Sequence, residues 1–495
     1  MGLCTAGIPK DARVSRPTYK LPVSLSQHQT PLLDALWQCS QRPHAPFYTP
    51  GHKQGSGISS RQRRVFGSDI FRLDLPELPE LDNLMAPDGA ILAAQQLAAG
   101  AFGAEASWFL ANGSTCGIEA ALLALCGPGD KVIVPRNVHQ SVVSGLILSG
   151  AHPVWLAPAY AEQWQLPLGL RAQQVANALE HHPDARAVLI VSPTYEGVCS
   201  DVAAIAELAH SYDIPLIVDE AHGPHLGFHP DLPDSALASG ADVVIQSVHK
   251  LLSAFTQAAL LHCQGQRCDR SRLSQALRMT QSSSPSYLLL ASLDAARHQM
   301  ATQGEALMTR TLALAQQARE QLALPVLNVS QTCQGFSQDL TRLTVDVTEK
   351  GTGYAVDSWL HRQGVTAELP SLRHLTFIVS LGNTARHIEQ LVAAMQQLPF
   401  QGPVPTIPPV PWADLMLPEI APRQTFFAAT ARLPLARAAG RLSAATVCPY
   451  PPGIPTIMPG EPVSQSMVDH LLAARAAGAE LVGLSGPDTD IEVIA

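Results

Sequence analysis

Short runs of consecutive apolar residues recur between about residues 90 and 260, and helix-length segments separate several of them. The runs include "SWFL", "KVIV", "AVLIV", "PLIV" and "DVVI". Strands without polar alternation are buried on both faces, as in a parallel sheet whose helical crossovers cover both sides. Segments such as "STCGIEAALLALC" and "DVAAIAELAHSY" have helical length and spacing. The pattern predicts an α/β domain with a mostly parallel sheet.

The rest of the chain divides into smaller units. A helical stretch at about 286–323 leads to the strand-like segments "LTRLTVDVT" and "LTFIVSLG", and the proline-rich "LPFQGPVPTIPPVPWADLMLP" follows. We therefore predict five parts: an N-terminal segment at 1–45, a large domain at 46–320, a small α+β domain at 321–400, a linker at 401–421 and a C-terminal domain at 422–495.

Composition excludes several classes of protein. The 495 residues are 46% hydrophobic and 15% charged, with a net charge of −9, which is typical of a globular protein and argues against a nucleic-acid binder. The nine cysteines form no CxxC pair, and we expect reduced thiols and no metal site. Without a signal-peptide core or a membrane-spanning run, the sequence predicts a cytoplasmic protein with no membrane partner.

Ligands of open α/β sheets bind at the carboxyl ends of the strands, and those ends carry ionisable and hydroxyl side chains here. Gly113, Ser114 and Thr115 open a helix after "SWFLAN", where backbone N–H groups and hydroxyls would bind a phosphate or simply cap the helix. Other strand ends deliver His139; Thr194 and Tyr195; Asp219, Glu220 and His222; and Ser247, His249 and Lys250.

A lysine, an aspartate and a phosphate cradle together suggest pyridoxal 5′-phosphate. The lysine would form a Schiff base with the cofactor aldehyde, and the aspartate would keep the pyridine nitrogen protonated. Of the six lysines, only Lys250 lies at a strand end downstream of a strand-end aspartate, Asp219.

Ordered motifs between about residues 30 and 470 resemble one family. They are "TPGHKQG", "LDLPELPELDNL", "LANGSTCGIEA", "PRNVHQSVVSGLILSGA", "SPTYEGV", "DEAHGPHLGFH", "QSVHKLLSAFTQ", "QSSSPSYLLLASLDAAR" and "YPPGIPTIMPGE". Together they resemble the short form of the Orn/Lys/Arg decarboxylase family. The resemblance implies a fold type I, aspartate aminotransferase-like large domain that binds pyridoxal phosphate, followed by the small domain and a C-terminal decarboxylase domain.

The resemblance also implies roles for individual residues. Lys250 would carry the cofactor, Asp219 would pair with the pyridine nitrogen, and His139 would stack on the ring. Phosphate and further cofactor contacts would come from Gly113, Ser114, Thr115, Thr194, Ser247 and His249. His222 would lie beside the ring and the substrate as a catalytic residue. Glu461 is the candidate for the distal cation of the substrate, with a structural role as the alternative.

The implied reaction is decarboxylation of a basic amino acid, arginine or lysine rather than ornithine, to agmatine or a diamine plus CO2 in polyamine metabolism. "TPGHK" and "SSSPSY" would reach the site of a neighbouring subunit in a homo-oligomer. Two alternatives stay open: an aminotransferase or other lyase, with Arg373 or Arg386 binding the substrate carboxylate, and an inactive regulatory paralogue. The acidic residues Asp74, Glu77, Glu80 and Asp82 either provide a field for a cationic substrate or form a surface loop.

Overall fold

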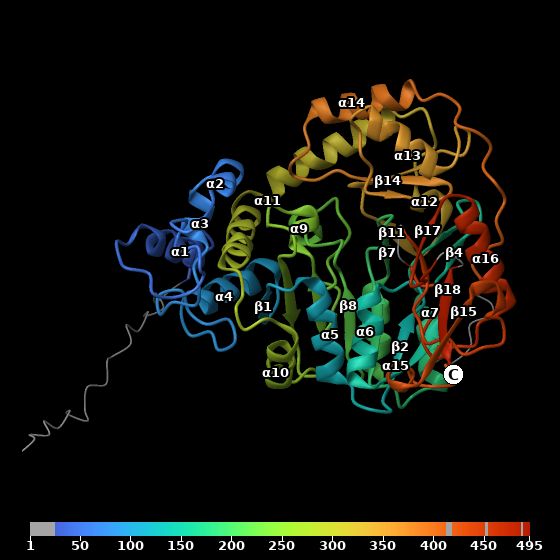
Figure 1. Cartoon of the computed structure of the whole chain (residues 1–495), viewed down its shortest axis with the longest axis horizontal. Helices are drawn as coiled ribbons and strands as arrows, with labels where there is room; N and C mark the ends of the chain where they lie inside the picture. The colour runs from blue at the N-terminus through green and yellow to red at the C-terminus, as the bar shows by residue number, and fades with distance from the viewer. Residues whose placement is uncertain (1–24, 412–417, 451–453, 487–488) are drawn as a thin grey trace, which may run out of the picture.

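The computed structural model describes residues 25–411, 418–450, 454–486 and 489–495. A central body carries a small domain at one end, a C-terminal domain along one side and a projecting N-terminal arm (Figure 1). The start of the predicted N-terminal segment, 1–24, and residues 412–417 of the predicted linker lie outside the described residues.

The central body is built on a seven-stranded sheet with the order β1-β10-β9-β8-β6-β2-β3. Strands β9, β8, β6, β2 and β3 pair in parallel, whereas β10 is antiparallel to both of its neighbours. The mostly parallel sheet is therefore confirmed, with one reversed strand that we did not expect. The bounds are β1 Ala106–Leu110, β2 Lys131–Pro135, β3 His152–Leu156, β6 Ala187–Val191, β8 Leu216–Asp219, β9 Val243–Gln246 and β10 Ala259–Cys263.

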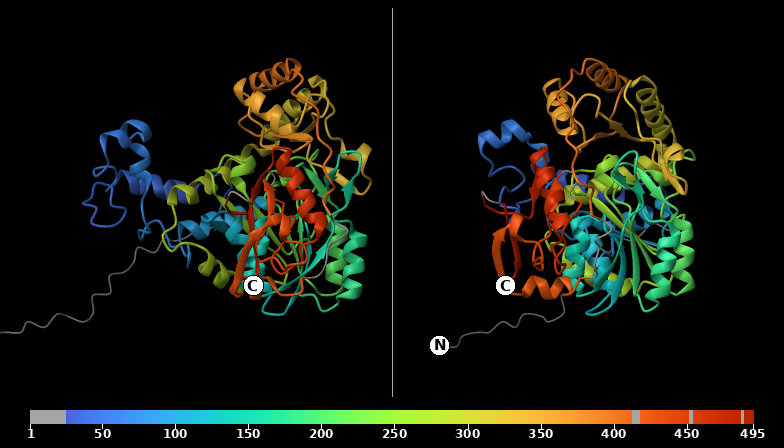
Figure 2. Two further views of the ribbon diagram at one scale, coloured as in Figure 1. Left: turned by 45° about the vertical axis from the view of Figure 1, so that its right-hand side comes forward. Right: turned by 90° about the vertical axis from the view of Figure 1, so that its right-hand side faces the viewer.

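Helices cover both faces of the sheet (Figure 2). Val132 and Val134 of β2 pack in one core with α5, α6 and α10, whereas Ile133 packs in a second core with α7 and α8. Alternate residues of a strand point to opposite faces, so an unbroken apolar run is what two buried faces require. The bounds are α4 Ala90–Phe102, α5 Gly113–Leu125, α6 Gln140–Ser149, α7 Ala172–His181, α8 Val202–Ser211, α9 Val248–Leu251 and α10 Arg270–Thr280.

The long helix α11, Tyr287–Gln321, runs from the central body into the small domain. There it packs with a three-stranded sheet of order β12-β14-β13. The remaining bounds are α12 Val329–Thr332, β12 Arg342–Asp346, α13 Gly353–Arg362, β13 Leu369–Pro370, β14 His374–Ile378 and α14 Ala385–Gln396, with β11 Phe336–Gln338 pairing with β7 Val198–Ser200 of the central body.

The C-terminal domain lies against the central body, where α15 packs on α6. It contains α15 Pro422–Phe427, β15 Thr430–Pro434, the 3-10 turn η3 Leu435–Arg437, β16 Cys448–Tyr450, α16 Gln465–Ala476, β17 Glu480–Val482 and β18 Asp490–Ile494. The arm contains α1 Pro31–Gln41, α2 Ser60–Phe66 and α3 Asp69–Leu73, and the central body also has the hairpin β4 Tyr160–Ala161 with β5 Leu166–Pro167 and the 3-10 turn η1 Leu226–Phe228.

None of the helices in the described ranges is long and apolar enough to cross a lipid bilayer. The cytoplasmic location stays a prediction.

Candidate active site

The neighbouring strands β8 and β9 bring an aspartate and a lysine to the same edge of the sheet. Asp219 is the last residue of β8 and pairs in register with Ile245 of β9. Lys250 does not end the strand itself, because β9 stops at Gln246 and the one-turn helix α9 follows. Lys250 therefore lies on a helical turn directly beyond the strand end.

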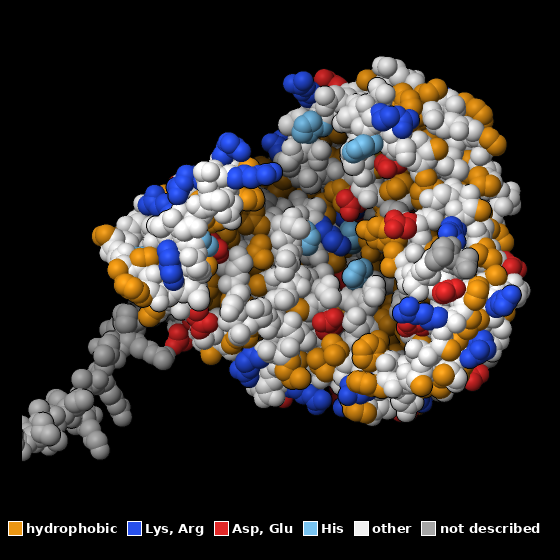
Figure 3. Space-filling view, viewed as in Figure 1, with side chains coloured by type: hydrophobic (Ala, Val, Ile, Leu, Met, Phe, Trp, Pro, Cys, Tyr) orange, Lys and Arg blue, Asp and Glu red, His pale blue; other side chains and the backbone are white. Residues whose placement is uncertain are grey.

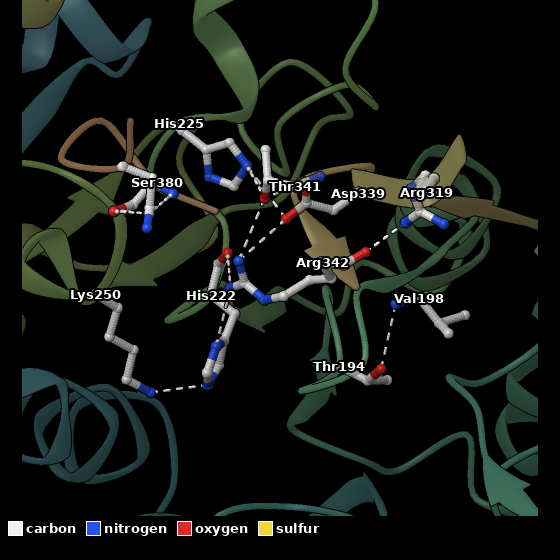
Figure 4. A network of polar contacts seen from close by, with 11 residues as sticks. Thr194, Val198, His222, His225, Lys250, Arg319, Asp339, Thr341, Arg342 and Ser380 are labelled. Atoms are coloured by element: carbon white, nitrogen blue, oxygen red, sulfur yellow. Dashed lines mark hydrogen bonds and ion pairs between the residues drawn. The ribbon is translucent and has the colours of Figure 1, made fainter. Parts of the chain in front are cut away.

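The amine of Lys250 is largely buried among polar groups. Its Nζ lies 2.9 Å from Nε2 of His222 (Figure 4). The same atom lies 5.9 Å from the ring centroid of Tyr195. Burial lowers the pKa of Lys250 from its ordinary value; the carboxylate of Asp219 opposes this shift and the guanidinium of Arg342 adds to it. A lysine with a lowered pKa is more readily neutral and hence nucleophilic.

Asp219 is 5% exposed, and its Oδ1 accepts a hydrogen bond from the Ala221 N–H at 3.1 Å. Burial raises the pKa of Asp219, whereas His139 and Lys250 lower it. The charges of Asp219, His139 and Lys250 thus interact at this edge of the sheet. Glu220, the next residue, is instead bound by the Ala236 N–H at 2.7 Å and by Nε2 of Gln246 at 2.6 Å.

The first turn of α5 has the features of an anion cradle. Gly113 has a φ of +78°, which a side chain would strain, and Asn112 before it makes no side-chain cap on the helix. Backbone N–H groups of this turn thus have no capping side chain. Ser247 Oγ donates to Ser114 Oγ at 2.8 Å, and Thr115 is exposed beside it. These donors fit a phosphate group at the positive end of the helix dipole.

Three further residues predicted to contact the cofactor, His139, His249 and Thr194, make hydrogen bonds within their own loops and turns. His139, an exposed residue, caps α6, and its Nδ1 accepts the Ser141 N–H at 3.1 Å. His249 directs Nδ1 to the Ala258 carbonyl at 3.1 Å. Thr194 is buried, and its hydroxyl accepts the Val198 N–H at 3.3 Å within a turn. The hydroxyl of Thr194 thus already has a local partner.

Glu461 lies in the C-terminal domain, 2% exposed, with Oε2 at 2.6 Å from Nη2 of the fully buried Arg136. Its Oε2 also accepts the Met458 N–H at 3.2 Å. A buried guanidinium neutralises this carboxylate, and the pair ties the C-terminal domain to the end of β2. These contacts support the structural role, the second of the two roles considered from the sequence.

The acidic residues 74–82 make contacts outside the catalytic edge. Asp82 accepts N–H groups at the start of α4, including Gly89 at 2.8 Å and Ile91 at 3.0 Å. Asp74 pairs with His52 of "TPGHK" at 3.0 Å, and Glu80 pairs with Arg42. For Asp74, Glu80 and Asp82 these contacts favour the loop interpretation. In "SSSPSY", the Ser282 N–H donates to Asn112 at 3.2 Å, beside the cradle of its own chain.

Two residues near Lys250 were missed from the sequence. Arg342, at the start of β12, is fully buried and donates to His222, and Glu368, an exposed residue before β13, acts electrostatically on Lys250, His249 and Arg342. Both belong to the small domain, so no pattern near Lys250 could have indicated them. Basic, acidic and histidine side chains gather in the hollow of this face (Figure 3).

Arg373 and Arg386, the two arginines considered for an aminotransferase, lie elsewhere in the small domain. Arg373 pairs with Asp346 at 3.4 Å, and Arg386 is exposed on α14. Within the described residues, the pairing of Arg373 with Asp346 and the exposed position of Arg386 give no support to a carboxylate clamp on either residue.

A lysine beside a buried aspartate at the edge of a mostly parallel sheet, next to a helix N-terminus with hydroxyl donors, defines a pyridoxal-phosphate enzyme of fold type I. Residues 30–344 match the family model of the Orn/Lys/Arg decarboxylase major domain, and residues 411–490 match that of its C-terminal domain. The chain belongs to the Orn/Lys/Arg decarboxylase family and is a pyridoxal-phosphate-dependent decarboxylase of a basic amino acid.

Individual relatives agree with this assignment. The chain is 38% identical to the arginine decarboxylases of Bacillus anthracis and of Bacillus subtilis (strain 168), covering 93% of this chain and 96% of each relative. Among solved structures, lysine decarboxylase A from Pseudomonas aeruginosa has a TM-score of 0.82 at 23% identity, covering 94% of this chain and 80% of that one. The structural likeness, at this identity, supports the fold alone.

Proposed function

We propose that the substrate is arginine and that the products are agmatine and CO2, which would place the enzyme in polyamine metabolism. The buried amine of Lys250, 2.9 Å from His222 and acted on by Asp219, is the observation that carries the chemistry. The choice of arginine rests on the two relatives of that name, which are similar over nearly the whole chain.

The roles of the cofactor residues are also part of this proposal. Lys250 would bind the cofactor aldehyde, Asp219 would hold a proton on the pyridine nitrogen, and His139 would cover the ring. The phosphate would lie at the start of α5, close to Gly113, Ser114, Thr115 and Ser247, with His249 two residues further along the chain. Thr194 would be a further cofactor contact. When bound, pyridoxal phosphate accepts the electron pair that carbon dioxide leaves on Cα.

Lys250 and His222 would supply the proton that Cα takes up in the last step of the reaction. Lys250 Nζ and His222 Nε2 lie within hydrogen-bonding distance of each other, so either can deliver a proton at the same place. Burial holds the pKa of His222 well below its ordinary value, and the charges of Lys250 and Arg342 lower it further. His222 therefore acts as a neutral ring that is readily deprotonated again after any proton uptake.

Glu368 replaces Glu461 in our proposal as the carboxylate that binds the guanidinium of the substrate. Glu368 is exposed on the small domain and its charge reaches Lys250, whereas Glu461 is neutralised by Arg136. An exposed carboxylate whose charge acts on the reacting lysine would favour substrates with a distal cation.

Replacing Glu368 with glutamine should lower kcat/KM for arginine by about tenfold, because a charge-assisted contact becomes a neutral one. The measurement is CO2 release with arginine, lysine and ornithine, with products separated by chromatography. Glu349→Gln, on the same domain, is the control. An unchanged kcat/KM in Glu368→Gln contradicts this role, and wild-type preference for lysine or ornithine contradicts the choice of substrate.

We further propose a homodimer in which the arm of one chain approaches the active site of the other. The arm exposes large apolar side chains: Phe47 is 97% exposed, Phe66 60% and Trp37 59%. Exposed apolar clusters on a projecting element are typical of protein interfaces. The "TPGHK" segment begins two residues after Phe47, so a partner that covers Phe47 would also contact this loop.

Replacing Phe47 and Phe66 together with glutamate should convert a dimeric or larger species into monomers and reduce activity. Sedimentation at micromolar concentration gives the oligomeric state, and CO2 release gives the activity. Phe400→Glu, at a residue 67% exposed beyond α14, is the matched control. A wild-type chain that sediments as a fully active monomer would refute the dimer.

A further inference from the structure

Arg342 reaches from the small domain to the histidine beside Lys250. Its Nη2 lies 3.1 Å from Nδ1 of His222 and 3.1 Å from the His222 carbonyl oxygen. The opposite ring nitrogen, Nε2, lies 2.9 Å from Nζ of Lys250. The three side chains form one line of hydrogen bonds from β12 to α9 (Figure 4).

The chemistry of the groups fixes the direction of these bonds. A guanidinium has donors and no acceptor, so Nδ1 of His222 must accept from Arg342 and carries no hydrogen. A neutral imidazole then has its proton on Nε2, which donates to Lys250. An ammonium has no lone pair to accept this bond, so the arrangement requires Lys250 to be a neutral amine. In this resting arrangement His222 is not cationic, because an N–H on Nδ1 would point at the guanidinium.

Arg342 has little freedom to move away. It is 0% exposed, and its Nη1 lies 3.3 Å from Thr341 Oγ1 and 3.6 Å from Oδ2 of Asp339. Asp339, also fully buried, accepts the Thr341 hydroxyl at 2.6 Å and lies 3.2 Å from Nε2 of His225. The guanidinium is therefore charge-balanced and held in place where the small domain meets the large one.

We propose that Arg342 is a positioning residue that keeps the proton of His222 on Nε2, so that His222 donates to Lys250 and leaves the lysine amine neutral. A neutral amine is the form that adds to an aldehyde, with the nitrogen lone pair forming the new C–N bond and the aldehyde oxygen leaving as water. The functional part of this inference rests on the proposed role of Lys250, whereas the position of the His222 proton does not.

Other charges also act on Lys250. They come from each element around it: Asp219 of β8, His139 before α6, His249 of α9 and Glu368 before β13. Asp219 and Glu368 favour the charged amine, and burial and Arg342 disfavour it. Loss of Arg342 thus removes both a cation and the hydrogen bond that fixes the His222 proton, and both changes favour protonation of Lys250.

The test is ¹⁵N NMR of the full chain with labelled histidines and with cofactor removed, in which the His222 signals are assigned by their loss in His222→Phe. The wild type should show a protonated Nε2 and an unprotonated Nδ1, and Arg342→Met should show a mixture of tautomers. A wild-type His222 protonated on Nδ1 overturns the proposal, and so does an unchanged tautomer in Arg342→Met. The wild-type spectrum decides even where Arg342→Met fails to fold.

A second readout is the pH midpoint for cofactor loading, followed by absorbance as the aldehyde is consumed. It should move upward by about one pH unit in Arg342→Met, because the amine becomes harder to deprotonate. Arg319→Met is the matched control: Arg319 is a second small-domain arginine that donates to the Arg342 and Leu327 carbonyls. Equal shifts in Arg319→Met and Arg342→Met would show a general packing effect and overturn the proposal.

Discussion

Replacing Lys250 with alanine should abolish the visible absorption of a lysine-bound cofactor and lower the decarboxylation rate by about 10⁴-fold or more. The variant loses the nucleophile that binds the aldehyde and, with it, one of the two groups placed to return a proton to Cα. Spectra of the purified protein and CO2 release from arginine are the measurements. The wild-type protein is the reference for both measurements.

The matched control for this variant is Lys131→Ala. Lys131 opens β2 and pairs with Asp184 at 2.9 Å, with both side chains partly exposed, and a surface ion pair of this kind contributes about 1 kcal/mol or less. It should keep the absorption and the activity. If Lys250→Ala decarboxylated at the rate of wild type, the active site assigned here would be wrong.

The sheet could be predicted because each strand is a run of apolar residues that is visible in the sequence. An apolar run such as "AVLIV" in β6 needs two buried faces, and only a covered sheet supplies them. The reversed strand β10 was missed because "ALLHC" has the same apolar character as a parallel strand. Strand direction depends on the connection, and the only helix between β9 and β10 is the one-turn α9, which is too short to carry the chain back along the sheet.

The site was predictable where its residues follow strand ends, and not where they cross between domains. Asp219 and Lys250 could be linked because adjacent parallel strands end at one edge. Arg342 could not be linked to the site, because nothing in the sequence around this small-domain strand indicates that its first residue contacts His222. The partner of Glu461 was hidden for the same reason: Arg136 precedes it by several hundred residues, and only the packing of the C-terminal domain brings them together.

Replacing Asp219 with asparagine should lower kcat by about 10²- to 10³-fold while the cofactor still binds Lys250, because the variant keeps the shape of the side chain and loses its charge. The amide oxygen can still accept the Ala221 N–H, so the loop after β8 should stay in place. Without the carboxylate nothing at this position favours a protonated pyridine nitrogen, and the pKa of Lys250 should fall further, because Asp219 is a group that raises it. Single-turnover kinetics and the pH dependence of the spectrum measure the two effects.

Asp242→Asn is the control for this variant. Asp242 is also buried and precedes β9 at the opposite edge of the sheet, where it is bound to His210 at 2.7 Å and to the Leu216 N–H at 2.8 Å. It should lower stability and leave the bound-cofactor spectrum unchanged, whereas a wild-type kcat in Asp219→Asn would remove Asp219 from the mechanism.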